Sequence, residues 1–102
     1  MVYNGLMRAL VKTSAQPGLT ATDRPDPKPG STDAIIRITA TSLCGTDAHI
    51  YNWDTWAHSR IHPPRIIGHE MCGEVVEVGA EVTLVKIGDY VAAESHITCG
   101  QC

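Results

Sequence analysis

The stretch that decides the fold class is residues 33–41, which read DAIIRITAT. β-Branched side chains dominate it, and such residues favour strands. Ile36 and Ile38 fall on one face of an extended chain, whereas Ile35 and Arg37 fall on the other. The alternation predicts a β-strand.

Segments of the same kind lie on both sides of this stretch, and glycines or prolines bound them. Pro17 and Gly18 mark a turn between the first two, and three prolines within residues 24–30 predict an extended connector that joins no sheet. The further predicted strands are Met7–Lys12, Leu19–Asp23, Gly73–Gly79 and Gly88–Glu94.

One short helix completes the predicted architecture. Gly45 breaks the strand of residues 33–41, and Thr46 or Asp47 can cap a helix that runs through His49 to Asn52. Short strands, frequent Gly and Pro and a single brief helix favour a mainly β fold, either a barrel or a sandwich.

The length and the net charge of the chain exclude several classes of function. A chain of 102 residues has room for one modest core, and a net charge of −3 gives no general attraction to nucleic acid or anionic membrane. No apolar run approaches the roughly 18 residues of a membrane span, and the N-terminus lacks the grading of a signal peptide. We therefore expect a cytosolic protein whose cysteines act as metal ligands or buried thiols, because cytosolic thiols stay reduced.

Cys44, His69 and Glu70 are the first candidate metal ligands, and each lies where a predicted strand meets a bend. Zinc accepts thiolate, imidazole and carboxylate, and a catalytic site keeps one position open. Adjacent strand residues point to opposite faces, so His69 and Glu70 share one ion only if the backbone turns between them. Otherwise Glu70 is an outer partner that tunes or transiently binds the ion. The alternative to a metal site is a buried thiol with a core histidine.

Thr46 and His49 are three residues apart and would share one face of a helix. A hydroxyl that passes a proton to an imidazole nearer solvent can serve as a relay for an alcohol that must lose its proton. The alternative is that Thr46 only caps the helix and that His49 is an exposed helix residue.

Cys99 and Cys102 form a CxxC pair, the usual half of a four-cysteine zinc or iron–sulfur site. A redox pair is the rival, but no βαβ pattern precedes it. Because the sequence ends on Cys102 itself, we expect the chain to be part of a longer polypeptide.

Glu94 and His96 follow the last predicted strand. A carboxylate there would hold a substrate ammonium group and an imidazole would orient a substrate carboxylate, unless both are simply solvated. Cys72 is expected to be a small buried hydrophobe without a role.

The motifs together resemble a known family. The run Gly68–Val76, with Gly79 and residues 86–91 (KIGDYV), resembles the zinc signature of the medium-chain alcohol dehydrogenases. More narrowly, residues 44–47 (CGTD), residues 49–56 (HIYNWDTW) and residues 96–100 (HITCG) resemble the L-threonine 3-dehydrogenase branch of that family. The likeness covers about residues 7–102, which leaves residues 1–6 as an extension.

The resemblance implies that residues 7–102 form a GroES-like β-barrel catalytic domain that is truncated within its structural-zinc lobe. In the whole protein a Rossmann domain that binds NAD would follow. Such enzymes are usually homotetramers and oxidise L-threonine to L-2-amino-3-oxobutanoate. By matched position, the relay pair is Thr46 and His49, and Trp53, Glu94 and His96 lie near the substrate. The implied ligands are Cys44, His69 and Glu70 for the catalytic zinc, and Cys99 and Cys102 for half of the structural zinc.

The 102 residues contain no GxGxxG motif, so the choice of NAD over NADP as cofactor rests on the resemblance. For the same reason the chain alone is expected to be inactive. Two alternatives stay open. One is a polyol or secondary-alcohol dehydrogenase of the same family. The other is a non-catalytic β module that binds a metal or a partner.

Overall fold

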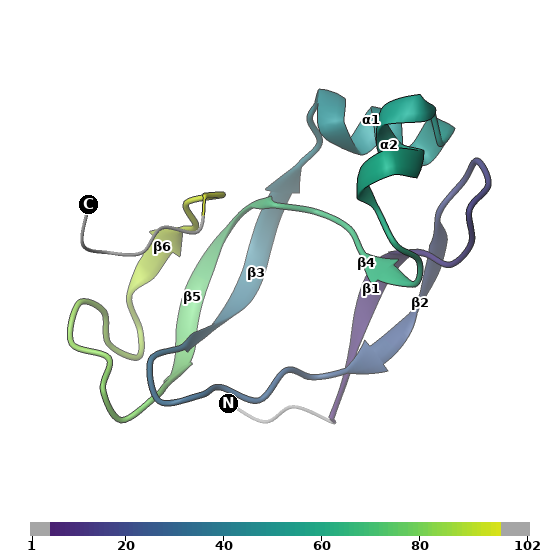
Figure 1. Cartoon of the computed structure of the whole chain (residues 1–102). Helices are drawn as coiled ribbons and strands as arrows, with labels where there is room; N and C mark the ends of the chain where they lie inside the picture. The colour runs from purple at the N-terminus through teal and green to yellow at the C-terminus, as the bar shows by residue number, and fades with distance from the viewer. Residues whose placement is uncertain (1–4, 97–102) are drawn as a thin grey trace. The chain divides into compact units, whose positions relative to one another are not determined.

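The computed structural model describes residues 5–96 of the chain. The chain divides into two units, which Figure 1 shows with their elements labelled. The first unit comprises Met1–Pro27 and Leu43–Gly68, and the second comprises Lys28–Ser42 and His69–Cys102.

The first unit contains a three-stranded antiparallel sheet in the order β2-β1-β4. β1 (Leu6–Lys12) and β2 (Thr20–Pro25) form the hairpin that the sequence predicted, and β1 also pairs with the short β4 (Arg65–Ile66). Gly18 lies in the connecting loop with φ at 106°, a conformation that glycine adopts without steric cost. Val11, on the central strand, is fully buried.

The expectation that residues 24–30 join no sheet is wrong for the first two of them. Arg24 and Pro25 belong to β2, where they pair with Met7 and Leu6. β2 is an edge strand and Pro25 is its last residue, a position at which a missing N–H costs the sheet little.

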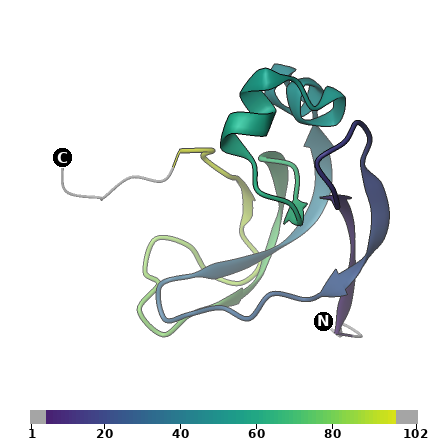
Figure 2. The same cartoon turned by 45° about the vertical axis from the view of Figure 1, so that its right-hand side comes forward.

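The first unit has two helices rather than the predicted one. Both α1 (Gly45–Asn52) and α2 (Thr55–Arg60) belong to the segment between β3 and β4, and Figure 2 shows them as neighbours in teal and green. Cys44 is the N-cap of α1, so the predicted caps Thr46 and Asp47 already lie inside the helix. Asp54 caps α2 by accepting the N–H of Ala57, which is fully buried.

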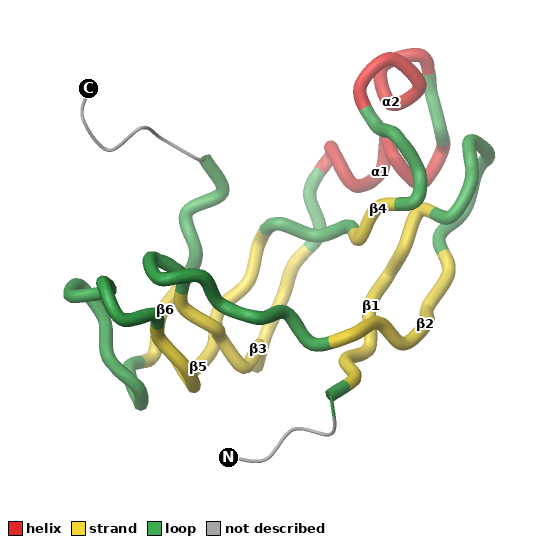
Figure 3. The backbone as a smooth tube through the Cα atoms, turned by 60° about the horizontal axis from the view of Figure 1, so that its bottom comes forward, coloured by secondary structure: helices red, strands yellow, loops and turns green. Residues whose placement is uncertain are grey.

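The second unit is built on a three-stranded antiparallel sheet in the order β3-β5-β6, whose yellow strands run side by side in Figure 3. β3 (Ala34–Ser42), β5 (Glu70–Val78) and β6 (Tyr90–Ala92) confirm three predicted strands. β5 begins three residues before the predicted Gly73, because residues 70–72 also pair with the end of β3. Val75 on β5 is the buried centre of this sheet.

The predicted mainly β class is therefore confirmed. Within residues 5–96 the strands pair in two three-stranded sheets and not in one closed barrel. No helix in that range has the length and apolar character needed to cross a bilayer.

Gly73 offers a test of how closely β3 and β5 approach. A Cβ added there would lie 2.1 Å from the carbonyl oxygen of Arg37, which is strand backbone and cannot swing away. We expect Gly73→Ala to lower the free energy of unfolding by about 1–3 kcal/mol, as overpacking does. Gly45→Ala is the matched control, because its Cβ meets nothing within 4 Å. Urea unfolding of both variants checks this, and equal stabilities would contradict the close approach.

Candidate metal and proton-relay site

The second unit has a cavity of about 520 Å³ where the ends of its three strands meet. β3 and β5 supply two walls, and the chain that leaves β6 supplies the third. The lining residues are Ala40, Thr41, Ser42, His69, Glu70, Met71, Cys72, Ala92, Ala93, Glu94 and Ser95.

His69 and Glu70 both line this cavity although they are adjacent in the chain. The strand alternation does not separate them, because β5 begins only at Glu70 and His69 precedes it. The residue before His69 is Gly68, whose φ of 118° turns the backbone just ahead of the strand. The chain thus turns before His69, and both His69 and Glu70 are among the residues that line the cavity.

Glu70 is held in place by its partner strand. Ser42 lies opposite Glu70 in the register, and its Oγ donates to the carboxylate Oε2 over 2.7 Å. The Thr41 hydroxyl donates to the Glu70 backbone carbonyl at 2.8 Å. A carboxylate accepts at about four lone-pair positions, so the bond from Ser42 leaves capacity for a metal ion.

Glu94 and His96 are both exposed and contact one another. The His96 Nδ1 and the Glu94 Oε1 are 2.8 Å apart, and the backbone N–H of His96 donates to the same oxygen. The His96 side chain, by this hydrogen bond above all, lowers the pKa of the Glu94 carboxyl. Glu94 lines the cavity, so a carboxylate is available there.

Cys44, the N-cap of α1 in the first unit, is half-buried. Its backbone N–H donates to the carboxylate of Asp47 at 3.1 Å, and Asp47 is buried. Sequence reasoning treated Asp47 only as a possible N-cap. The signal for its actual place is the three-residue spacing of a capping box, in which an acidic residue reaches back to the N-cap amide.

Thr46 and His49 both lie on α1, as the spacing predicted, with Thr46 half-buried and His49 exposed. The Nδ1 of His49 contacts the carboxylate of Asp54, the cap of α2. The ring of Trp56 lies 6.0 Å from the imidazole, tilted by 54°. His49 therefore has a polar neighbour and an aromatic neighbour, both from the next helical segment.

Trp53 caps the end of α1 in the left-handed conformation, with φ at 55°. The ammonium of Lys12 lies 5.2 Å from its ring centre. Lys12 is fully buried, and its Nζ donates to the backbone carbonyls of Gln16, Gly18 and Tyr51 at 2.8, 2.6 and 3.4 Å. Burial lowers the pKa of Lys12. Sequence reasoning missed this residue, because a lysine in a strand carries no signal of burial.

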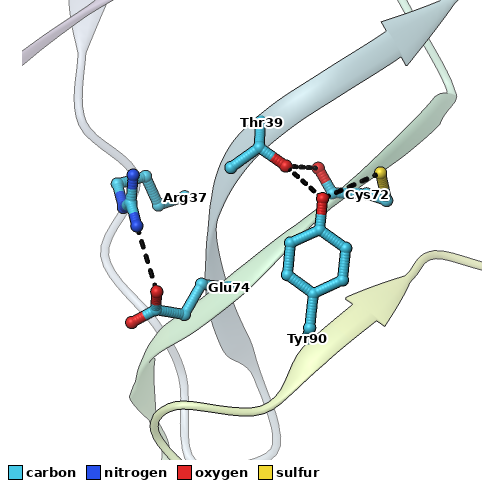
Figure 4. A network of polar contacts seen from close by, with 5 residues as sticks. All are labelled: Arg37, Thr39, Cys72, Glu74 and Tyr90. Carbon is cyan, nitrogen blue, oxygen red and sulfur yellow. Dashed lines mark hydrogen bonds and ion pairs between the residues drawn. The ribbon is translucent and has the colours of Figure 1, made fainter.

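Cys72 lies within β5 and is half-buried, so the expectation that it is buried is wrong. Its Sγ is 3.6 Å from the hydroxyl of Tyr90, which also contacts the Thr39 hydroxyl at 2.5 Å. Figure 4 shows this group beside the Arg37–Glu74 ion pair. The contacts join all three strands of the sheet, which is a structural role.

The donor types that these units contain fit zinc. The thiol of Cys44, the imidazole of His69 and the carboxylate of Glu70 are the three ligand classes of catalytic zinc sites. Cys99 and Cys102, the predicted half of a structural site, lie outside the described residues.

The lowered pKa of the Asp54 carboxyl predicts how the free energy of unfolding changes in acid. Its pKa lies below the ordinary value of 3.8, chiefly because the Ala57 N–H donates to it and further because His49 faces it. A carboxylate whose pKa is lower in the folded than in the unfolded state stabilises the fold at any pH above its unfolded-state pKa. This stabilisation is lost as the pH falls through the folded-state pKa. We expect the free energy of unfolding of Asp54→Asn to fall less steeply with acid. Urea titrations below about pH 5 check this, and parallel curves would contradict it.

Comparison with known proteins gives a consistent family. Residues 30–102 match the family model described as the alcohol dehydrogenase GroES-like domain. A curated relative from Bacillus licheniformis, named L-threonine 3-dehydrogenase, is 52% identical over 97% of this chain and 29% of its own length. The chain thus spans under a third of that relative.

Two solved structures agree in fold. A zinc-dependent alcohol dehydrogenase 2 from Streptococcus pneumonia superposes with a TM-score of 0.81 at 36% identity, over 94% of this chain and 27% of that one. A short chain alcohol dehydrogenase from E. coli CFT073, complexed with cofactor NADH, gives a TM-score of 0.78 at 28% identity, over 97% of this chain and 27% of that one.

Proposed function

The chain belongs to the family of alcohol dehydrogenase GroES-like domains, and from this premise we propose that it supplies the zinc-binding part of an NAD-linked L-threonine 3-dehydrogenase. Membership confirms the predicted family and the GroES-like fold. The matched relatives are more than three times as long as this stretch, so the proposed activity belongs to the whole protein that carries the chain.

The observation that carries the proposal is the shared cavity of His69 and Glu70. His69 precedes β5 and Glu70 is its first residue, and both are among the residues that line one cavity of the second unit. Ser42 and Thr41 hold Glu70 there by hydrogen bonds to its side chain and its backbone. An imidazole and a carboxylate are thus placed on one cavity, and Cys44 is the thiol that would complete the ligand set.

Zinc bound by Cys44, His69 and Glu70 would act as a Lewis acid on the substrate hydroxyl. We propose that Thr46 accepts the hydroxyl proton and passes it to His49, which is exposed and can release it to water. NAD, held by a domain outside this chain, would take the hydride from the carbon that bears the hydroxyl, so L-threonine and NAD would give L-2-amino-3-oxobutanoate, NADH and one proton.

Recognition of an amino acid requires partners for two charged groups. Glu94 lines the cavity as a carboxylate whose pKa is lowered, so it would hold the ammonium of threonine. His96, in contact with Glu94, would orient the substrate carboxylate. Trp53 is the third proposed substrate contact, in addition to its contact with Lys12.

The remaining parts of the proposal follow the family resemblance. Cys99 and Cys102 supply half of a structural zinc site, and NAD binds to a Rossmann domain elsewhere in the whole protein. The whole enzyme is a cytoplasmic homotetramer with residues 7–102 of this chain as its GroES-like domain and residues 1–6 as an extension.

The test is NADH production by the whole protein that carries this chain. L-Threonine, sorbitol and 2,3-butanediol are compared in parallel, before and after zinc chelation. We expect threonine to be preferred and the activity to disappear on chelation. A preference for sorbitol or butanediol would keep the zinc chemistry and overturn the substrate, and no reduction with any of them would favour a non-catalytic module.

A further inference from the structure

His49 and Asp54 connect the end of α1 to the start of α2 within the first unit. The His49 Nδ1 contacts one carboxylate oxygen of Asp54, and the other oxygen accepts the N–H of Ala57 at 2.9 Å. In the opposite direction, the Asp54 N–H donates to the backbone carbonyl of His49 at 3.4 Å. The carboxylate therefore has both oxygens engaged and its own backbone fixed to the residue whose ring it contacts.

The turn that carries this contact is itself held by neighbouring groups. Trp53 adopts the left-handed conformation, and its N–H donates to the Ile50 carbonyl at 3.2 Å. Lys12 donates to the Tyr51 carbonyl and lies over the Trp53 ring. These contacts restrict the orientations that the His49 ring can adopt.

The chemistry of the pair fixes the protonation of the imidazole. An ionised carboxylate can only accept hydrogen bonds, so the His49 Nδ1 must be the donor in this contact. In a neutral imidazole the other nitrogen then has the free lone pair. We propose that Asp54 is a positioning residue that holds neutral His49 with its proton on Nδ1 and thereby makes Nε2 the nitrogen that receives the relayed proton.

The helix cap alone does not require this contact. An N-cap uses one side-chain oxygen to accept an amide N–H, which Ser, Thr or Asn does equally well. Asp54 uses Oδ1 for that purpose, and its second oxygen goes to His49. The role of His49 as relay base rests on the proposed function, whereas the position of the ring proton is a property of this chain by itself.

The first test reads the ring proton directly. In ¹⁵N NMR of the chain above the titration of His49, we expect the Nδ1–H form to predominate. Asp54→Asn should keep the cap and reverse the preference, because its NH₂ would donate to Nδ1. Asp54→Ser should keep the cap but lose the preference, because its side chain is too short to reach the ring. A predominant Nε2–H form in the wild type, or the same tautomer in all three proteins, would overturn the proposal.

The second test measures the consequence for the reaction. In the whole protein, we expect Asp54→Asn to lower kcat/KM by at least about tenfold, the scale on which orienting partners act. Asp33→Asn is the matched control, since Asp33 also accepts a backbone N–H at 2.9 Å but is exposed in the second unit. If the tautomer reverses and kcat/KM does not fall, the positioning role is wrong. An inactive wild type would instead refute the proposed function, and the NMR result would still decide the proton position.

Discussion

Replacing Cys44 with serine is expected to weaken zinc binding more than about 100-fold, because even the outer hydrogen-bond partner of a metal ligand is commonly worth 10- to 100-fold. The hydroxyl of serine is a poor substitute for a thiolate as a zinc ligand. NADH production by the whole protein should fall with the metal content. Zinc analysis after dialysis and an initial-rate assay measure the two quantities on the same sample.

Cys72→Ser is the matched control for zinc content. Cys72 is the other half-buried cysteine of the described residues, and it contacts Tyr90 on the β3-β5-β6 sheet. We expect this variant to retain its zinc. Full zinc and full activity in Cys44→Ser would show that Cys44 is not a ligand, and an equal zinc loss in Cys72→Ser would show that the loss is not specific to Cys44.

Replacing Lys12 with methionine is expected to lower the free energy of unfolding by about 3 kcal/mol, through three lost charge-assisted hydrogen bonds and the carbonyls they leave behind. Methionine keeps the apolar stem, so the loss reports on the ammonium group and not on a cavity. The fully buried Lys12 ties the β1–β2 loop to the end of α1 through the carbonyls of Gln16, Gly18 and Tyr51.

Lys28→Met is the control for this second prediction. Lys28 is exposed on the Pro-rich connector, and surface substitutions of this kind usually stay within about 0.5 kcal/mol. Urea unfolding of the two variants measures the difference. Equal midpoints and slopes would show that the buried ammonium adds nothing.

The strands were predictable because their residues carry a local pattern. The alternation of residues 33–41 and the glycine-bounded run from Gly73 specify β3 and β5 without reference to the rest of the chain. The start of β5 at Glu70 was not predictable in this way. It depends on pairing between Ser42 and Glu70, two residues that are 28 positions apart.

Helix α2 shows a different limit. Its N-cap Asp54 is a standard start signal, but six residues are too few for a helical periodicity to emerge. Trp56 at its second position entered the prediction only within the motif of residues 49–56. The contact of His49 with Asp54 was invisible for the same reason, since five residues across a break between helices correspond to no recognised spacing.

The candidate site was predictable in its residue types and not in its geometry. Cys44, His69 and Glu70 could be named from their chemistry, while the placement of His69 and Glu70 on one cavity depends on where β5 begins and on the backbone at Gly68. The hydrogen bonds of the buried Lys12 likewise combine two carbonyls of the adjoining loop with that of Tyr51, 39 positions away. Such features come from tertiary contacts that a single sequence does not display.

Zinc K-edge X-ray absorption of the chain, with Cys99 and Cys102 both replaced by serine, tests the proposed zinc site most directly. One bound zinc should then show a single sulfur at about 2.3 Å and nitrogen or oxygen ligands at about 2.0–2.2 Å. This spectrum would agree with a ligand set of Cys44, His69 and Glu70. Absence of bound zinc, or a bound zinc without sulfur, would contradict it.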